Sequence, residues 1–386
     1  MTDSDVLSDA LPGRATAEGT QRFAERFPGR PGHFRRPDRL SLSSIGLGMR
    51  NGEVGGADDL AYRQAVMRAL DCGVNVFDTA LSYRMQTSER ALGAALGRRI
   101  AEGQVERDEI CVISKGGYVT ADPSFVRSRA DVRRYVYETY VDSGLIDPER
   151  VVNGNHSIEP RFLRDQIERS RRNLGLETID VYCIQDPELH MLGKGPTEFW
   201  RELREAFAAL EAAVADGAIA SYGLSTWSGL LVPYTEKGHL SIAELLETAL
   251  EVGGADHHLR ALQLPYNLAM GEALGLPSQF APESEGAALL EAVLGTGTAV
   301  FAVAPLVQGR VVQQVQLPEV LMRAFPEART NAQRALQFVR SSTGVTSAIV
   351  GMRREDHVIE NLALTEHPPA SPEAIASLYE DSASGP

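Results

Sequence analysis

Cysteine is scarce in this chain. Its 386 residues include three cysteines, Cys72, Cys111 and Cys183, which are widely spaced and each lie inside an apolar run. An odd number of cysteines in such settings is typical of small core residues, so we expect neither a disulfide nor a metal site. Long apolar stretches are also missing, because no run reaches the roughly 18 residues of a membrane span, and the N-terminal thirty residues are polar and acidic. The sequence therefore predicts no membrane span and no secretory signal, and we expect a cytoplasmic protein.

Positive charge is the second shortage. Lysine and arginine number 38 against 52 acidic residues, which gives a formal net charge of -14 and a pI near 5.1. Nucleic acids and anionic membranes favour basic surfaces, so we expect neither as a partner. The 43% hydrophobic and 23% charged composition is that of an ordinary globular protein with an extensive core. A small-molecule ligand is therefore the expected partner, and no feature of the sequence indicates an oligomeric state.

Short β-rich apolar runs alternate with longer helical stretches from about residue 41 to residue 364. The helical stretches carry apolar residues at spacings of three and four, so each has one stripe that can cover a sheet. Such alternation predicts βαβ units and a parallel sheet. The predicted fold is therefore α/β, a single (β/α)8 TIM barrel. Its eight candidate strands begin near Ser43, Val74, Glu109, Thr178, Ile219, Arg260, Ala299 and Ser347.

Three segments depart from the regular alternation. Residues 1–38 contain several glycines and prolines and are predicted to form a partly extended N-terminal arm that leads into the barrel floor. The barrel itself is predicted to span residues 39–370, and residues 371–386 to form a C-terminal tail. Residues 117–157 form a long insertion after the third strand. Loops that follow barrel strands lie on the face that carries active sites, so the insertion is interpreted as a lid or specificity element, or alternatively as a surface decoration.

Three ionisable residues are placed at neighbouring strand ends. The apolar strand VNVFD ends in Asp78, Tyr83 follows five residues later, and the next strand, CVISK, ends in Lys115. Because the ends of parallel strands share one rim of a barrel, we expect the three side chains to meet there. A lysine at a buried strand end needs a counter-ion, since an unpaired ammonium is costly in a low-dielectric site. The alternative is a purely structural ion pair capped by a tyrosine.

These residues are part of a longer pattern. The chain reads Asp-Thr-Ala from Asp78, then Tyr83, Ser-Glu from Ser88 and Leu-Gly from Leu92. In this it resembles the aldo-keto reductases, whose signature has the same order. The strings SRRNLGLETIDVYCIQDPE, YGLSTW, LQLPYNL, APLVQG and SAIVGMRREDHVIENL follow in the order of that family, so the resemblance covers about residues 40 to 364.

The resemblance implies hydride transfer from a bound nicotinamide to a carbonyl carbon, with Tyr83 as the proton donor. A free tyrosine has a pKa of about 10 and needs help to exchange protons near neutrality. Lys115 would favour the phenolate by Coulomb attraction, and Asp78 would anchor the lysine.

The chain departs from the family at the end of the fourth strand, where Gln185 stands in place of the usual histidine. An amide can orient a carbonyl oxygen by hydrogen bonding, but it cannot relay a proton. His156 or His190 could supply an acid from elsewhere, with a surface or capping role as the alternative for each. Arg84 follows the proposed acid where many members have glycine; it could bind an anionic substrate group, or point to solvent, or pair with an acidic side chain. Trp227 lies in a loop expected to shape the substrate pocket.

Cofactor-binding residues are also implied by the resemblance. Ser225, Thr226 and Gln263 match the groups that bind the nicotinamide carboxamide, with Thr226 in place of the usual asparagine. Leu306, Gln308 and Arg310 match the loop near the pyrophosphate. The motif that contacts the adenosine is matched by Gly351, Met352, Arg353, Arg354, His357, Glu360 and Asn361. Arg353 and Arg354 favour NADP(H) over NAD(H) by charge complementarity with the 2'-phosphate, although His357 stands where arginine is common.

These features favour an NADP(H)-dependent oxidoreductase that reduces an aldehyde, a ketone or a sugar-like carbonyl, or catalyses the reverse. Tyr83 would act as the general acid and base, Lys115 and Asp78 would activate it, and Gln185 would orient the substrate. Two alternatives stay open because Gln185 replaces histidine. One is a redox-neutral epimerase or lyase that recycles its bound nucleotide, and the other is a non-catalytic sensor that binds NADP(H).

Overall fold

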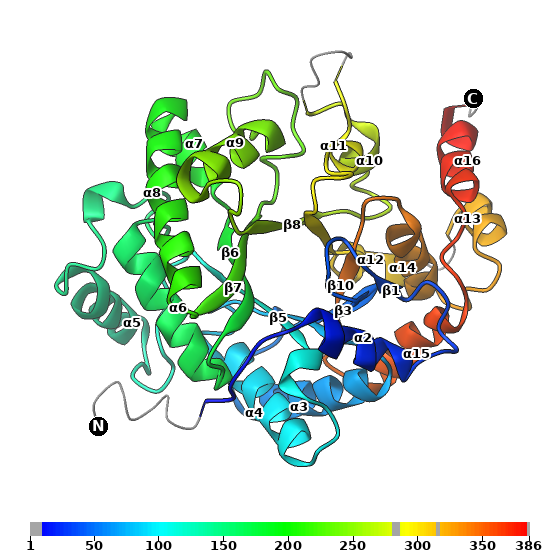
Figure 1. The fold of residues 1–386 in the computed structure, drawn as a ribbon, viewed down its shortest axis with the longest axis horizontal. Coiled ribbons are helices and arrows are strands. Elements are labelled where there is room, and N and C mark those ends of the chain that lie inside the picture. Colours follow the sequence, from blue (N-terminus) through cyan, green and yellow to red (C-terminus); the bar gives the residue numbers. More distant parts are fainter. Residues whose placement is uncertain (1–9, 280–285, 314–316, 384–386) are drawn as a thin grey trace.

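A computed structural model describes residues 10–279, 286–313 and 317–383 of the chain. Eight parallel strands close into a barrel, with helices around its outside (Figure 1). The predicted (β/α)8 fold is therefore confirmed, and every predicted strand lies where the sequence placed it. The strands, in their order around the barrel, are β10 (Ser347–Gly351), β3 (Ile45–Gly48), β4 (Val76–Asp78), β5 (Cys111–Gly116), β6 (Ile179–Gln185), β7 (Ile219–Ser225), β8 (Leu259–Pro265) and β9 (Ala299–Val303).

The strands are buried on both faces, which explains their continuous apolar runs. Alternate residues point inward and fill the barrel, where Ile113, Phe301 and Ile349 pack with two of the cysteines. Cys111 and Cys183 are buried free thiols in this cluster, as expected for small core residues, whereas the free thiol of Cys72 is partly buried.

The helices that cover the barrel begin and end at residues suited to those positions. For example, α6 starts at Pro160, whose missing N–H costs nothing in a first turn, and stops before Gly175, which has a left-handed φ of 63°. No helix within the described ranges is long and apolar enough to cross a membrane. The long covering helices are α3 (Gly56–Asp71), α4 (Thr87–Ala101), α6 (Pro160–Leu174), α8 (Pro196–Ala215), α9 (Ile242–Gly253), α14 (Asn331–Ser341) and α15 (Glu355–Ala363). Shorter helices are α7 (Glu188–Lys194), α10 (Glu272–Gly275), α11 (Leu289–Ala292), α12 (Arg310–Gln313) and α13 (Glu319–Ala324).

The described part of the N-terminal arm is more ordered than its composition suggests. It contains helix α2 (Ala17–Glu25), followed by β1 (Phe34–Arg35), which pairs antiparallel with β2 (Leu42–Ser43). Helix α2 starts with an N-cap, because the Thr16 hydroxyl accepts a hydrogen bond from the amide of Gly19. The C-terminal segment also contains a helix, α16 (Pro372–Ala383), which packs near α13 and α14.

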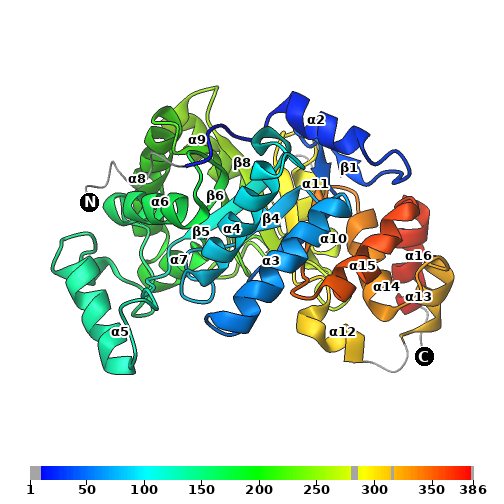
Figure 2. The same ribbon diagram turned by 90° about the horizontal axis from the view of Figure 1, so that it is seen from below.

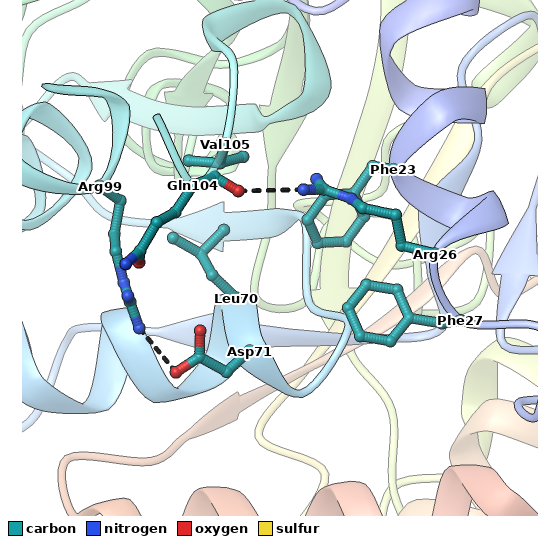
Figure 3. A pocket seen from close by; sticks show the side chains of 8 residues that line it. All are labelled: Phe23, Arg26, Phe27, Leu70, Asp71, Arg99, Gln104 and Val105. Carbon is teal, nitrogen blue, oxygen red and sulfur yellow. Dashed lines mark hydrogen bonds and ion pairs between the residues drawn. The ribbon is translucent and has the colours of Figure 1, made fainter. Parts of the chain in front are cut away.

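A cavity of about 150 Å³ lies beneath α2 (Figure 3). Two hydrogen bonds join residues that line it, from Arg26 to the main-chain oxygen of Gln104 and from Arg99 to Asp71. It lies at the end of the barrel where the strands begin, and is therefore remote from the strand ends that carry the candidate catalytic residues. Its lining residues are Phe23, Arg26, Phe27, Leu70, Asp71, Arg99, Gln104 and Val105.

The insertion after β5 stands beside the barrel. Helix α5 (Arg129–Val136) has no buried residue and projects from the molecule, continued by a π-helical turn at Tyr137–Val141 (Figure 2). Beyond it, Tyr140 and Ile146 form a small separate core with Phe162 at the start of α6. The two ends of the insertion pair as a neck through hydrogen bonds from the amide of residue 119 to the oxygen of residue 155 and from residue 157 to residue 117. This neck fixes the first and last residues of the insertion next to the strand ends.

Candidate active site

Asp78 and Lys115 form a buried ion pair at the end of the barrel where the strands finish. The Lys115 ammonium lies 2.6 Å from Oδ1 of Asp78 and donates to the main-chain oxygen of Thr79 at 2.7 Å. Strands β4 and β5 are neighbours, so their last residues meet at one rim. Both side chains are almost completely buried, at 4% and 0% exposure, and each provides the charge that the other needs in a low-dielectric site.

Tyr83 completes the cluster, because the Lys115 ammonium lies over its ring, 4.6 Å from the centroid. Burial raises the pKa of Tyr83 above its ordinary value of 10.0, and this effect outweighs the opposing attraction of the ammonium. Burial alone would lower the pKa of Lys115, but Asp78 and the phenol more than compensate, so that pKa is raised. The expected lowering by Lys115 is thus present but is not dominant, and at neutral pH the phenol is protonated beside a charged ammonium.

Two polar residues of strands β7 and β8 extend this cluster. Gln263 of β8 donates from Nε2 to Oδ1 of Asp78 at 2.7 Å, and Ser225 of β7 donates to Oε1 of Gln263 at 2.8 Å. The structure therefore brings Ser225 and Gln263, both predicted at the cofactor site, into one chain with Lys115. This chain fixes the orientation of the Gln263 amide.

Thr226 does not face the site as a free ligand group. Its hydroxyl donates to Oε1 of Glu188 at 2.8 Å and accepts from the amide of Gly229. The same carboxylate oxygen accepts from the amide of Trp227 at 2.8 Å, so a buried glutamate organises the whole loop after β7. The predicted carboxamide role of Thr226 is therefore not supported by its side chain, whereas the indole of Trp227 is 40% exposed.

Arg84 is held by contacts within the protein. Its guanidinium donates to the main-chain oxygen of Glu53 at 2.8 Å, lies 2.5 Å from Oδ1 of Asp59, and stacks over the ring of Tyr62. Its side chain is only 1% exposed. Of the roles considered from sequence, the structure supports pairing with an acidic side chain, because the loop turns Arg84 away from the barrel mouth and towards α3.

Gln185, at the end of β6, is held through both its main chain and its side chain. The Ser82 hydroxyl donates to its Oε1 at 3.5 Å, and its main-chain oxygen lies 2.6 Å from Nε2 of His156. His156 is fully buried and contacts His190, which is 1% exposed. The surface role considered for these histidines is therefore wrong, because both are buried behind Gln185.

Two residues that the sequence did not single out lie beside Gln185. Asp186 directly follows β6, and the Tyr118 hydroxyl donates to its Oδ2 at 2.7 Å. Burial raises the pKa of Asp186 to about 6. Burial, and then the hydrogen bond to Asp186, raise the pKa of Tyr118. The charge of Arg50, in the loop after β3, opposes the rise of the pKa of Asp186, Tyr118 and Tyr83. The position of Asp186 directly after a strand could have suggested it as a site residue. The position of Tyr118 depends on how the neck of the insertion pairs, which the sequence does not show.

The predicted pyrophosphate loop follows β9. Leu306 precedes a 3-10 turn at Val307–Gly309 that includes Gln308, whose side chain lies outside the described part of the structure. Arg310 is exposed and begins α12. These positions are compatible with a loop that borders the barrel mouth.

The predicted adenosine-binding residues follow β10. Arg353 lies 2.6 Å from Asp58 and Arg354 donates to Asp356 at 2.9 Å, so both guanidinium groups already contact a carboxylate. Met352 is fully buried in the core, so its side chain is not a cofactor contact. The remaining three residues of the motif differ in exposure, because Gly351 and His357 are exposed and Glu360 is partly buried.

Asn361 is the most informative of this group. It is 4% exposed, and its Oδ1 has no hydrogen-bond partner among the described residues. A buried amide oxygen without a partner is costly, so a ligand donor is one way to satisfy it. No cluster of three or more potential metal-ligating residues occurs in the described ranges.

Comparison with known proteins gives consistent results. The model of the aldo/keto reductase family matches residues 44–238, half of the chain. A D-threo-aldose 1-dehydrogenase from Pseudomonas sp is 30% identical over 193 residues, 48% of this chain and 51% of that protein. An NADH-specific methylglyoxal reductase from Escherichia coli (strain K12) is 23% identical over 224 residues, 55% of this chain and 58% of that protein. The chain thus matches about half the length of these curated relatives.

Solved structures match over most of the barrel. An aldo/keto reductase from Klebsiella pneumoniae, in complex with NADP and acetate, has a TM-score of 0.58 and 22% identity, covering 91% of this chain and 95% of that chain. An aldo-keto reductase from Bacillus halodurans in its holo form has a TM-score of 0.59 and 18% identity, covering 90% and 96%. At these identities the likeness concerns the fold.

Proposed function

Since this chain belongs to the aldo/keto reductase family, we propose that it is an NADP(H)-dependent oxidoreductase that reduces an aldehyde, ketone or sugar-like carbonyl to an alcohol, or catalyses the reverse. The observation that carries the proposal is the position of the Lys115 ammonium, which lies between the carboxylate of Asp78 and the ring of Tyr83 at the barrel mouth. A structural ion pair alone would not need a phenol ring beside the lysine ammonium.

In this proposal Tyr83 donates a proton to the carbonyl oxygen of the substrate. Its raised pKa keeps the phenol protonated before the reaction, and the Lys115 ammonium stabilises the phenolate that remains afterwards. Asp78 holds the lysine charged and in place. Gln185 has its Oε1 towards Ser82, which leaves its amide nitrogen to donate to the same carbonyl oxygen. When bound, the reduced nicotinamide supplies the hydride.

The residues present fit a dinucleotide. Ser225 and Gln263 would hold the carboxamide end, and the loop that carries Arg310 would border the phosphates. The unpartnered Oδ1 of Asn361 is available to accept from an adenine amino group. Arg353 would meet a 2'-phosphate, in exchange for its contact with Asp58. The NADP in the Klebsiella structure supports this preference, and the NADH specificity named for the E. coli relative makes it worth testing.

A polyol or sugar is the preferred substrate class within this proposal. The D-threo-aldose specificity named for the Pseudomonas relative supports it. Asp186 and Tyr118 also support it, because a carboxyl group and a phenol side by side offer acceptors and a donor for neighbouring hydroxyl groups.

The test is oxidation of NADPH with a panel of aldehydes, ketones and aldoses, and reduction of NADP with the corresponding alcohols. Tyr83→Phe should lower kcat by about 10²- to 10⁴-fold, since it removes the general acid. Tyr137→Phe is the matched control, because Tyr137 is 58% exposed on the insertion. Unchanged turnover in Tyr83→Phe contradicts the assignment. Product formation without net NADPH consumption would favour the redox-neutral alternative, and binding without turnover would favour the sensor.

A further inference from the structure

A line of buried polar groups runs from Gln185 to helix α8. The main-chain oxygen of Gln185 lies 2.6 Å from Nε2 of His156, at the end of the insertion. Nδ1 of His156 lies 3.2 Å from Nε2 of His190 on α7, and Nδ1 of His190 lies 2.6 Å from Oε2 of Glu202 on α8. All three side chains of this line are at most 1% exposed. Residues from three separate segments are thus joined directly behind Gln185.

Counting protons determines the charge of this line. A carbonyl oxygen and a carboxylate can only accept hydrogen bonds, and both ends of the line are of this kind. Three hydrogen bonds in series therefore need three N–H groups on the two imidazoles. Two neutral imidazoles carry only two. The three contacts thus need one additional proton. With Glu202 ionised, Nε2 of His156 then donates to Gln185 and both nitrogens of His190 are protonated.

The surroundings of Glu202 and His156 suit this distribution. Burial would raise the pKa of Glu202, but His190 and Lys194 outweigh it and the pKa falls to about 2. Burial lowers the pKa of His156 to about 3, helped by the neighbouring charge of His190. Both pKa shifts agree with the proton count given by the hydrogen bonds. Arg150 also contacts Glu202, at 3.2 Å.

Other charged or titratable groups lie at the edges of the line. Lys194 lies 2.7 Å from Oε1 of Glu202, and Arg150 is shared with Glu205 at 2.8 Å and Glu159 at 3.8 Å. On the other side, the ring of Tyr118 packs edge-on against His156, with centroids 4.9 Å apart. None of these groups approaches the junction between the two imidazoles as closely as the histidines approach each other.

We infer that the His156–His190 pair carries one additional proton, is held charged by Glu202, and positions Gln185 for the reaction, so that loss of this proton releases Gln185. This inference rests on the proposed function. After deprotonation only two N–H groups remain for three contacts. Either the contact between His156 and Gln185 or the contact between the two imidazoles then has no hydrogen and joins two lone pairs. His156, His190 and Glu202 are positioning residues, because none is placed against the substrate. Their effect should appear in the pH dependence of kcat more than in KM.

The first experiment needs no turnover. The full-length protein is labelled with ¹⁵N in its histidines, and the imidazole nitrogens are observed by NMR between pH 5 and pH 9. His156→Gln and His190→Gln identify the signals among the eight histidines of the chain. We expect one histidine with both nitrogens protonated at neutral pH, coupled to a neutral one protonated at Nε2. Two neutral imidazoles at pH 6 to 7 would overturn the inference, whether or not the protein reduces carbonyls.

The second experiment uses turnover. Glu202→Gln keeps a hydrogen-bond acceptor but removes the counter-ion, so the additional proton should be lost at lower pH. The alkaline limb of the kcat profile should then move to lower pH, and kcat above that limb should fall by up to about a hundredfold through misplacement of Gln185. Glu205→Gln is the matched control, because Glu205 also contacts Arg150 but not His190. Identical profiles for the two variants would refute the inference, whereas an inactive wild type with the NMR pattern intact would refute the proposed function alone.

Discussion

At the scale of single residues, the buried lysine has the largest consequence for both stability and reaction. Lys115→Met should destabilise the protein by about 3–5 kcal/mol, because it leaves the buried carboxylate of Asp78 without its partner. Urea unfolding at pH 7 measures this change. Lys237→Met, at an exposed position, should change stability by less than about 0.5 kcal/mol. Because the folded-state pKa of Lys115 is raised, its contribution is complete below the ordinary lysine pKa and disappears only in more alkaline solution. Similar stability of the two variants would contradict a stabilising role for the ion pair between Lys115 and Asp78.

Asp186 gives a second prediction, with a pH dependence of the same sign in a lower pH range. Its folded-state pKa is raised to about 6, so the folded protein holds a proton that the unfolded chain releases from about pH 4 upwards. Asp186→Asn should therefore gain stability relative to wild type as pH rises from 4 to 7. Asp142→Asn, at an exposed position, should show no such trend. Unfolding titrations of the three proteins at pH 4, 5.5 and 7 measure the trend, and a constant difference between Asp186→Asn and wild type would contradict the prediction.

The candidate catalytic residues were predictable for a simple reason. Asp78 and Lys115 lie at the ends of adjacent parallel strands. The ends of barrel strands meet at one rim, and this does not depend on the conformation of the loops. The contacts of Arg84 and Thr226 were not predictable to the same degree, because the conformation of a loop determines which groups lie next to them. Arg84 itself has a φ of 49°, a left-handed conformation that no local pattern announces.

At the scale of elements, the insertion is the least regular part of the fold and gives the third prediction. Tyr140 is fully buried, packs against Phe162 and donates to the main-chain oxygen of Thr120 at 2.8 Å. Tyr140→Ala should unfold the insertion locally, since large-to-small changes at such positions cost about 3–5 kcal/mol. Limited trypsin digestion should then cut the arginine-rich residues 127–134 faster, while the melting of the barrel changes little.

Tyr137→Ala is the control for this experiment, because Tyr137 lies on the same π-helical turn and is 58% exposed. Kinetics of the same variants distinguish the two interpretations of the insertion. A raised KM in Tyr140→Ala alone supports a lid or specificity element, and unchanged kinetics support a surface decoration. Equal protease sensitivity of both variants would show that the small core does not hold the insertion.

Helices and strands were predictable where the local sequence pattern determines them. They were less predictable where contacts with distant residues stabilise them. The eight strands are apolar runs bounded by polar turns, and all eight were recognisable. Helix α2 was not, because nine residues form a marginal helix in isolation. It is stabilised by contacts far away in the sequence, where Arg22 reaches Asp108 at 2.6 Å and Glu109 at 3.1 Å.

At the scale of the whole molecule, the protein is strongly acidic, yet it is proposed to bind a polyanion. The net charge of -14 repels NADP(H) at long range, so binding depends on a few cations at the site. Arg353 and Arg354 are adjacent and 42% and 64% exposed, which leaves them free to exchange Asp58 and Asp356 for a 2'-phosphate. Binding of the nucleotide should be measurable as an increase in the stability of the whole protein. A ligand at 100 times its Kd raises the free energy of unfolding by about 2.7 kcal/mol.

The fourth prediction compares two cofactors on two variants. The double substitution Arg353→Ala with Arg354→Ala should weaken NADP binding by about tenfold or more. Each tenfold loss of affinity reduces the stabilisation of the protein by NADP by about 1.4 kcal/mol. NAD binding should be unchanged, because NAD lacks the 2'-phosphate. Thermal unfolding with each nucleotide measures both effects. Arg63→Ala, an exposed position on α3, should behave as wild type. Because loss of the ion pairs with Asp58 and Asp356 would affect both nucleotides alike, equal loss of NAD and NADP stabilisation would assign the arginines a structural role and contradict the preference for NADP.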